Sequence, residues 1–376
     1  MQFTLNDMQQ MLQDTAVRLV RDRCSFEQRM QIVASQQGYS SELWAEYASL
    51  GLLGIEIDEV HGGSGGSFQD LAVVLEAFGR GLVVEPFIST VVLGAGLVSA
   101  AGDEAAKQAI LPRIAAGTMK LALAYGEPEG RYDPAHVATT AAADGDGFVL
   151  NGRKAVVLGA DCADLLIVSA RTDGSTTDPR GISLFLVEAG ASGVEMNAYG
   201  NMDDRRAAEV TFRDVRVPAG ALLGPLGGGL APLEAALDRG AAALCCEAVG
   251  VMAALNEMTL EYIKTRRQFG RPIGTFQVLQ HRMADMVMAT EQARSVALLA
   301  AEHANNPDAA TRRQAMSAAK VQMGLSAQIV GRGAIQLHGG MGLTMECSAA
   351  HYFRRLTAVE MMFGDIGHHL ARYAAA

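Results

Sequence analysis

The stretch Arg266-Arg267-Gln268-Phe269-Gly270-Arg271-Pro272-Ile273-Gly274 separates two long runs, residues 235–264 and 275–304, whose apolar residues recur at helical spacing. Pro272 and the flanking glycines disfavour a continuous helix, and Thr275 is a favourable N-cap for the next one. The sequence therefore predicts two long helices joined as a hairpin that carries several arginines at its end.

The rest of the C-terminal part also has helical spacing. Four helical segments are predicted, at about residues 231–264, 275–304, 308–337 and 346–374, with breaks at glycine- or proline-containing stretches. Four helices with short connections predict a four-helix bundle over residues 229–376.

The two segments before the bundle differ from each other in their pattern of apolar residues. Residues 1–118 read as an N-terminal helical domain, whereas residues 119–228 contain short apolar runs separated by turn-rich spacers. Asn151-Gly152, inside the run 148–158, predicts a tight hairpin turn. The expected fold class is therefore α+β: an N-terminal helical domain, a central antiparallel β domain and a C-terminal four-helix bundle.

Composition excludes several classes of protein. The 376 residues carry a net charge of −10, which argues against nucleic acid and anionic membranes as partners. No signal peptide and no apolar run of about 20 residues is evident, so no membrane contact is expected. No metal-ligand cluster stands out. The five scattered cysteines fit reduced thiols and a cytoplasmic location; they are Cys24, Cys162, Cys245, Cys246 and Cys347.

One charged residue lies in an otherwise apolar helical run. Glu247 follows Ala241-Ala242-Ala243-Leu244-Cys245-Cys246 and precedes Ala248-Val249-Gly250. A buried carboxylate is costly unless it is paired, or it is retained for chemistry with a raised pKa. The sequence leaves two interpretations open: a catalytic group, or a side chain that touches water or a cation not evident from the sequence.

Four motifs together resemble the acyl-CoA dehydrogenase family. The run 266–273 with Phe276-Gln277 looks like the family's flavin-contacting hairpin, and Gln336-Leu337-His338-Gly339-Gly340-Met341-Gly342 resembles its second flavin motif. Asn151-Gly152-Arg153-Lys154 resembles a hairpin of its β domain, and His61-Gly62-Gly63 its N-terminal glycine turn. The motifs occur in the family's order over nearly the whole chain.

The resemblance implies an FAD cofactor and a shared site. In the family, the matching residues bind the FAD of a neighbouring subunit, which gives that role here to Arg266, Phe269, Gln277, Gln336 and Gly340. The arginine fork suits the pyrophosphate, and the glycines let the backbone approach a ligand closely. Dimerisation follows from a site shared between subunits; the alternative is that Arg266 and Gln336 only stabilise helix ends.

The implied reaction is α,β-dehydrogenation of an acyl-CoA thioester. A glutamate removes the α proton, and the β hydrogen passes as hydride to the flavin N5. Many members carry this glutamate in a Tyr-Glu-Gly-Thr motif, whereas the matching residues here are Met362-Phe363-Gly364-Asp365. A subgroup that includes steroid-degrading members resembles this chain, and the resemblance implies a base on the helix that carries Glu247. Glu247 is therefore the predicted base, with Asp365 and Glu360 as fallbacks.

The same resemblance suggests a substrate and partners. Arg239 is the candidate for contacting the CoA chain, unless it pairs with Asp238. Val156-Val157-Leu158 replaces the family's Trp-Ile-Thr/Ser contact, which favours a bulky or steroid-like acyl group. Electron-transfer flavoprotein is the expected electron acceptor. Two alternatives remain open: a non-catalytic scaffold subunit of a heteromeric acyl-CoA dehydrogenase, and a flavin oxidase on the same fold.

Overall fold

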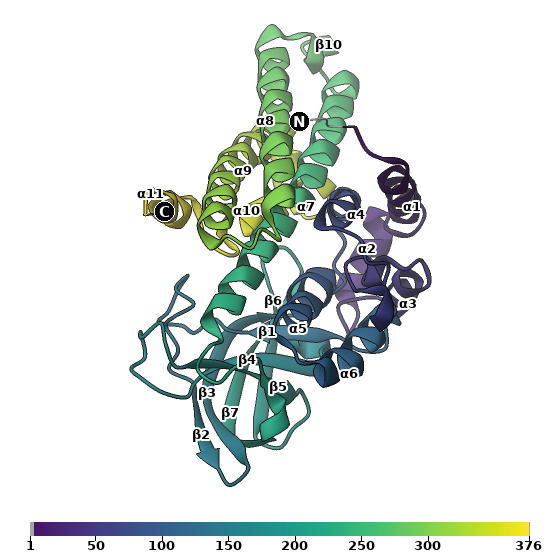
Figure 1. Cartoon of the computed structure of the whole chain (residues 1–376). Coiled ribbons are helices and arrows are strands. Elements are labelled where there is room, and N and C mark those ends of the chain that lie inside the picture. Colours follow the sequence, from purple (N-terminus) through teal and green to yellow (C-terminus); the bar gives the residue numbers. More distant parts are fainter. Residues whose placement is uncertain (1–3, 376) are drawn as a thin grey trace. The chain divides into compact units, whose positions relative to one another are not determined.

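The computed structural model describes residues 4–375, which form two units (Figure 1). The first unit contains residues 4–31, 68–83 and 241–375, and it is almost entirely helical. The second contains residues 32–67 and 84–240, and it holds the β-sheet and several short helices.

Three helices of the first unit begin at residues whose side chains cap them. Asn6 and Gln9 form a capping box at the start of α1, Asp308 caps α9, and Asp365 caps α11. The helices that lie wholly or largely in this unit are α1 (Asp7–Arg23), α2 (Phe26–Ala34), α4 (Phe68–Arg80), α7 (Leu230–Thr265), α8 (Gln277–His303), α9 (Ala309–His338), α10 (Ser348–Met361) and α11 (Ile366–Ala374).

The helices α4 and α7 meet backbone to backbone through glycines. A Cβ on Gly79 would lie 2.0 Å from the carbonyl oxygen of Glu247, and a Cβ on Gly250 would lie 1.9 Å from that of Glu76. Only glycine permits this approach. Gly79 and Gly250 therefore allow α7, the helix that carries Glu247, to pack closely against α4.

The predicted hairpin between α7 and α8 is present, but its second helix starts later than expected. The connection forms a short antiparallel pair, β9 (Arg267–Gln268) and β10 (Arg271–Pro272), and then the 3₁₀ turn η6 (Ile273–Thr275). Phe276, not Thr275, is the N-cap residue of α8, because the Thr275 hydroxyl donates backwards to the carbonyl of Pro272 (2.8 Å).

The fourth predicted bundle helix is two helices. α10 ends at Met361, and α11 begins at Ile366 after a turn in which Phe363 (φ 56°) and Gly364 (φ 109°) have left-handed backbone conformations. The break coincides with Gly364 and with the N-cap Asp365, whose side chain accepts from the backbone N–H of His368 (2.8 Å). The helical periodicity continues across this turn, which is why the sequence pattern did not reveal it.

The second unit is built on an eight-stranded sheet in the order β6-β7-β3-β2-β4-β5-β8, with β1 paired to β4. Its strands are β1 (Leu121–Ala124), β2 (Thr140–Asp144), β3 (Gly147–Leu158), β4 (Leu165–Arg171), β5 (Ile182–Glu188), β6 (Val194–Gly200), β7 (Arg206–Pro218) and β8 (Leu222–Leu223). The helical elements of this unit are α3 (Ser41–Ser49), η1 (Leu52–Gly54), η2 (Glu59–His61), the π-helix η3 (Ile88–Ala95), α5 (Gly96–Ala101), α6 (Glu104–Ala115), η4 (Ala160–Cys162) and η5 (Ala219–Ala221).

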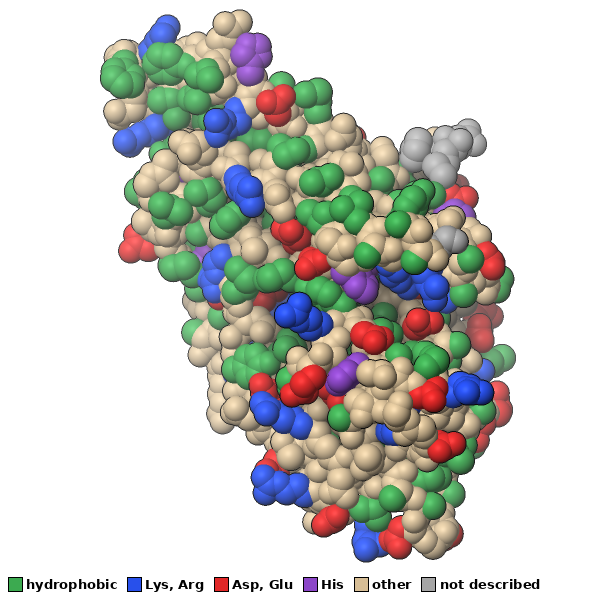
Figure 2. All heavy atoms as spheres, turned by 90° about the vertical axis from the view of Figure 1, so that its left-hand side faces the viewer, with side chains coloured by type: hydrophobic (Ala, Val, Ile, Leu, Met, Phe, Trp, Pro, Cys, Tyr) green, Lys and Arg blue, Asp and Glu red, His purple; other side chains and the backbone are tan. Residues whose placement is uncertain are grey.

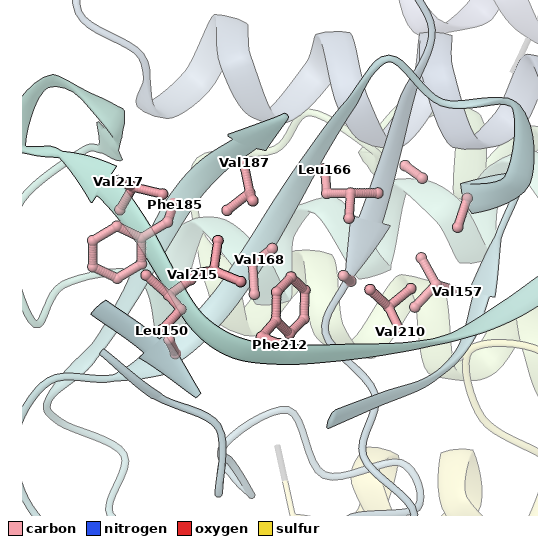
Figure 3. Close-up of a cluster of buried hydrophobic side chains, with 14 of the residues drawn as sticks. Leu150, Val157, Leu166, Val168, Phe185, Val187, Val210, Phe212, Val215 and Val217 are labelled. Carbon is pink, nitrogen blue, oxygen red and sulfur yellow. The ribbon is translucent and has the colours of Figure 1, made fainter. Parts of the chain in front are cut away.

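Valine, leucine and phenylalanine side chains from the sheet form the core of this unit. Leu150, Val168, Phe185, Val210 and Phe212 converge there (Figure 3). They come from the four strands β3, β4, β5 and β7 and are at most 2% exposed, so one apolar cluster connects these strands.

Two details of the predicted β domain are wrong. Asn151-Gly152 is not a hairpin turn: both residues lie inside β3, where the register against β7 shifts between Leu150 and Gly152. The two-residue turn is at Gly145-Asp146, between β2 and β3. The sheet is also not purely antiparallel, because β1 pairs with β4 in parallel. The α+β fold class itself is confirmed.

By length and composition, α7 alone among the described helices could cross a membrane, but 78% of its most apolar 18-residue window is buried. Burial of this kind is the property of a core helix. Within residues 4–375, no group of three or more His, Cys, Asp or Glu side chains is arranged to hold a metal ion.

Candidate functional site

The end of the α7–α8 hairpin presents aromatic and cationic side chains together. Phe269 is 91% exposed and has a left-handed backbone (φ 52°). Its ring packs edge-on near Phe276 (centroids 6.2 Å apart), and the guanidinium of Arg271 lies 4.2 Å from the Phe276 ring. In Figure 2, hydrophobic and basic side chains lie side by side at the top of the view, where the hairpin ends.

Arg266 and Gln277 stand at the two sides of this hairpin. The backbone of Arg266 is fixed, because its N–H donates to Tyr262 (2.8 Å) and its carbonyl accepts from Ile273 (2.8 Å). Both side chains are exposed, and within residues 4–375 neither makes a hydrogen bond or ion pair. The structure therefore presents polar side chains from a fixed backbone with no partner in the described chain.

The second predicted motif lies against the base of the same hairpin. The rings of Tyr262 and His338 stack with centroids 4.5 Å apart, and the Tyr262 hydroxyl donates to the His338 carbonyl (3.3 Å). Gln336 and Gly340 flank His338, and both are exposed. No atom of the described residues would lie within 4 Å of a Cβ on Gly340. The structure thus brings the two motifs together and leaves open space at the glycine.

Glu247 is buried, as expected, but it is paired. Its two carboxylate oxygens accept from Arg355 on α10, Oε1 from Nε (2.9 Å) and Oε2 from Nη2 (2.6 Å). Glu247 is 1% exposed and Arg355 2%. The second interpretation, a carboxylate that contacts a cation not evident from the sequence, therefore fits this geometry, and the cation is the guanidinium of Arg355. Both oxygens are engaged, which argues against Glu247 as a base in this arrangement.

The turn at residues 362–365 stands where many members of the resembled family carry their base. No carboxylate occupies the position of Phe363, as the sequence shows. The turn is held from two sides: Lys320 on α9 donates to the carbonyl of Met362 (2.8 Å), and His369 on α11 lies 2.9 Å from that of Phe363. Burial lowers the pKa of Lys320 to about 8 and that of His369 to about 3.

The two fallback carboxylates lie beside this turn. Asp365 caps α11 with Oδ1, which gives it a structural role. Glu360, the residue before the last one of α10, is partly exposed, and its Oε1 accepts from Gln328 (2.8 Å). Within residues 4–375, no hydrogen bond engages the other oxygen of Glu360. Unlike Glu247, Glu360 keeps one oxygen without a hydrogen bond in this part of the chain, and unlike Asp365 it caps no helix.

Arg239, the candidate for contacting CoA, lies in the second unit and pairs with Glu56. Nη2 lies 2.7 Å from Oε2 and Nη1 lies 3.3 Å from Oε1. Its guanidinium packs over Gly96, since a Cβ there would be 2.9 Å from Nε. The structure therefore gives Arg239 a partner, Glu56, that the sequence did not suggest.

Sequence reasoning missed the partners of several buried charges. Lys154 is fully buried on β3, where its Nζ donates to Glu127 (2.7 Å) and Ser169 (3.0 Å). Burial lowers the pKa of Lys154 to about 8, although Glu127 opposes the shift. Lys320 follows Ala318-Ala319 in the sequence. A charge in an apolar run, the signal that drew attention to Glu247, would also have identified Lys320.

Three family models match the chain in succession. They are described as the acyl-CoA dehydrogenase N-terminal domain (residues 6–118), middle domain (residues 122–215) and C-terminal domain (residues 227–376). A probable acyl-CoA dehydrogenase of Bacillus subtilis, YngJ, is 32% identical over 368 residues, covering 96% of this chain and 95% of the relative.

Solved structures agree with the family models. Butyryl-CoA dehydrogenase from Megasphaera elsdenii superposes with a TM-score of 0.92 at 29% identity, covering 100% of this chain and 99% of the other. A chain of a Tcur3481–Tcur3483 steroid acyl-CoA dehydrogenase variant gives 0.88 at 31%, covering 99% and 98%. A chain from a structure described as the electron-transferring flavoprotein of Acidaminococcus fermentans gives 0.92 at 29%, covering 100% and 98%.

These matches extend over the length of the chain and agree with its helical and sheet elements. The chain belongs to the acyl-CoA dehydrogenase family, and it is an oxidoreductase that acts on CH–CH bonds.

Proposed function

We propose that the chain catalyses FAD-dependent α,β-dehydrogenation of an acyl-CoA thioester. Membership of the family supports the reaction class. The FAD assignment rests on the two motifs that Tyr262 and His338 connect, because they present exposed polar side chains from fixed backbone, and these side chains have no partner among residues 4–375.

The residues of the hairpin suit a dinucleotide cofactor. Arg266 offers a planar guanidinium to a pyrophosphate, while Gln277 and Gln336 offer amide donors. The open space at Gly340 allows its backbone to approach a ligand, and Phe269 offers an exposed apolar ring. When bound, FAD supplies the acceptor for the hydride that leaves the β carbon. These residues hold and orient it, and in the family such a site belongs to a neighbouring subunit.

The reaction needs a carboxylate that can accept the α proton. Glu247 remains a prediction for this role, but its ion pair with Arg355 must open before either oxygen can take a proton. We propose Glu360 as the base to test first, since one of its oxygens makes no hydrogen bond within residues 4–375 and its side chain is partly exposed.

We propose a bulky acyl group as the substrate. Val156 and Leu158 stand where the family carries a Trp-containing contact, and Val156 is 57% exposed. The similarity to a steroid acyl-CoA dehydrogenase chain supports the same substrate class. Arg239 stays our candidate for contacting CoA; it would have to exchange Glu56 for the ligand or bind with Glu56 in place.

Partners and location are also proposals. We propose electron-transfer flavoprotein as the electron acceptor, supported by the similarity to a chain from a structure of such a protein. We propose a homo-oligomer or a heteromer with a second acyl-CoA dehydrogenase-like chain, because several apolar side chains on α8 and α9 are exposed. They include Val278, Val287, Met288, Leu298, Leu325 and Ile329. We propose a cytoplasmic location, which fits five cysteines that are all free thiols.

Purification of the chain alone tests the function. Protein that carries FAD and loses its flavin absorption under anaerobic conditions on addition of an acyl-CoA would support the proposal. Straight-chain, branched and steroidal thioesters should be compared, and a bulky acyl group should react fastest. Protein that binds flavin only with a second chain would instead support the scaffold alternative. Oxygen consumption without an added acceptor would support an oxidase.

A further inference from the structure

Lys320 is a buried cation held by backbone alone. It is 2% exposed on α9, and its Nζ donates to the carbonyls of Val359 (2.6 Å), Met362 (2.8 Å) and Glu360 (3.3 Å). No carboxylate of residues 4–375 lies within ion-pair distance of Nζ. An ammonium has three hydrogens to donate, so these three carbonyls satisfy it.

The three acceptors lie where a helix ends. The last carbonyls of α10 have no partner within the helix, and its C-terminal end attracts a cation. Lys320 supplies both a donor and a charge from a neighbouring helix. It therefore does for α10 what a capping residue would do from within the chain.

His369 holds the other side of the same turn. Its Nε2 lies 2.9 Å from the Phe363 carbonyl, and its Nδ1 lies 3.4 Å from the Ser317 hydroxyl. Because a carbonyl only accepts, Nε2 carries the proton. The low pKa of His369, caused first by burial, keeps the ring neutral at ordinary pH.

The turn between these two anchors needs holding. Phe363 has a left-handed backbone (φ 56°), which a residue with a side chain adopts at a cost, and Gly364 (φ 109°) lies in a region that favours glycine. A Cβ on Gly364 would lie 2.5 Å from His368 and 2.7 Å from Nε2 of His369. The turn keeps this conformation because its surroundings impose it.

We propose that Lys320 is a positioning residue that fixes the end of α10 and the turn Met362–Gly364 for oxidation of the bound acyl-CoA. Its ammonium bonds to the carbonyl of Glu360 itself and to carbonyls on both sides of it. The inference rests on the proposed function for the reaction, but its structural part, that Lys320 holds this turn, is independent of it.

The structural part is tested by hydrogen exchange in Lys320→Met, which keeps an unbranched side chain only one bond shorter and removes its donors. We expect faster amide exchange in peptides covering residues 359–366 than in wild type, with little change in α1. Lys107→Met, on α6, is the matched control and should exchange like wild type. Unchanged exchange at residues 359–366 would overturn the proposal.

The reaction is tested by anaerobic stopped-flow reduction of the bound flavin, with steroidal and straight-chain acyl-CoA as probes. We expect the reduction rate per bound flavin to fall about tenfold or more in Lys320→Met, because a small misplacement of a reacting group has effects of this size. A purely structural role would lower the melting temperature and flavin content but leave the rate per flavin unchanged, and that result would overturn the proposal.

Two controls keep the test decisive. If Lys320→Met does not fold, Lys320→Gln takes its place, because glutamine retains N–H donors on a side chain one bond shorter than lysine. This variant should give a smaller change of the same sign in both the exchange and the flavin-reduction measurements. Wild-type behaviour in both measurements would overturn the proposal. If the wild-type chain shows no flavin reduction with any thioester, the proposed function fails. The exchange result then still decides whether Lys320 holds the turn.

Discussion

Among single residues, Glu247 illustrates the difference between a buried carboxylate in an ion pair and a carboxylate available as a base. Both oxygens of Glu247 are held by a buried guanidinium, whereas a base needs an oxygen that can receive a proton, so the ion pair must open if Glu247 is the base. The sequence identified the buried acid because it interrupts an apolar run. It could not identify the partner, because Arg355 lies 108 residues away and adjoins a second arginine, Arg354.

We predict that Glu247→Gln lowers the free energy of unfolding substantially and changes the rate of flavin reduction by acyl-CoA only slightly. Removing one partner leaves the buried charge of Arg355 without its counter-ion, which costs about 3–5 kcal/mol in comparable cases. Urea denaturation measures the loss, and Glu302→Gln, at an exposed site on α8, should be close to neutral. The double variant Glu247→Leu with Arg355→Met should recover much of the lost stability. A stable Glu247→Gln protein with bound flavin that acyl-CoA cannot reduce would instead identify Glu247 as the base.

A pH dependence follows from the lowered pKa of Lys320. Burial lowers that pKa from 10.5 to about 8, so above pH 8 the unfolded chain binds a proton at Lys320 that the folded chain has lost. Stability therefore rises with pH between about 8 and 10.5 through this group. The cost of burying the ammonium is fully present below pH 8. Its neighbours in this environment are the side chains of Cys245, Arg355, Glu360, Asp365 and His369.

Wild type and Lys320→Met should therefore differ in how their free energy of unfolding changes with pH. Between pH 7.5 and 9, wild type should gain about 1 kcal/mol relative to the variant, because only wild type carries the shifted group. Urea unfolding at the two pH values measures this difference, and other titrating groups cancel in the comparison. A difference that stays constant or shrinks with pH would contradict the lowered pKa.

At the scale of elements, the long helices and most of the longer strands could be predicted from periodicity, but their ends and turns could not. Gly364 ends a helix without interrupting its apolar spacing, and Asn151-Gly152 forms a bulge where local sequence favours a turn. The strand β6 was missed because its alternating residues are mostly partly or fully exposed. In each case, tertiary packing decided between local conformations of similar energy.

The α7–α8 hairpin carries the cofactor prediction. Arg266→Ala should weaken FAD retention, because it removes a guanidinium from a fixed backbone while leaving no buried group unpaired. Flavin content per chain after gel filtration measures the effect, and we expect at least a several-fold loss. Arg113→Ala, an exposed arginine on α6, should retain flavin like wild type. Full retention of FAD by Arg266→Ala would refute the pyrophosphate role.

At the scale of the whole molecule, the outer faces of α8 and α9 carry the expectation of self-association. Gln292 of α8 and Gln322 of α9 are hydrogen-bonded across these faces (3.2 Å). Met288 precedes Gln292 by one helical turn, and Leu325 follows Gln322 by nearly one. Met288 and Leu325 are both exposed, so apolar side chains of the two helices contribute to the surface next to this hydrogen bond.

We predict that the chain is at least dimeric and that Ile329→Glu weakens its association. The introduced charge would be desolvated wherever Ile329 is covered by another chain. Analytical ultracentrifugation should show a shift toward monomer, and Val60→Glu, at an exposed site in the second unit, should sediment like wild type. A wild-type monomer that holds FAD would contradict the shared site.

The sequence motifs led to the family, and the family models and structural matches confirmed it. The three-part division at residues 118 and 228 remains a prediction. Motifs reveal residues that contact ligands because their types and spacing are restricted. They do not reveal Arg355, Lys320 or Glu56, whose roles depend on which distant residue each one meets.

Anaerobic titration of the purified, flavin-loaded chain with acyl-CoA thioesters, with its visible absorption recorded, is the decisive test of the proposed dehydrogenation. We expect the flavin band to be lost on mixing with at least one thioester, fastest with a bulky acyl group, and the α,β-unsaturated thioester to form in proportion. A flavin band that persists with straight-chain, branched and steroidal thioesters alike would contradict it.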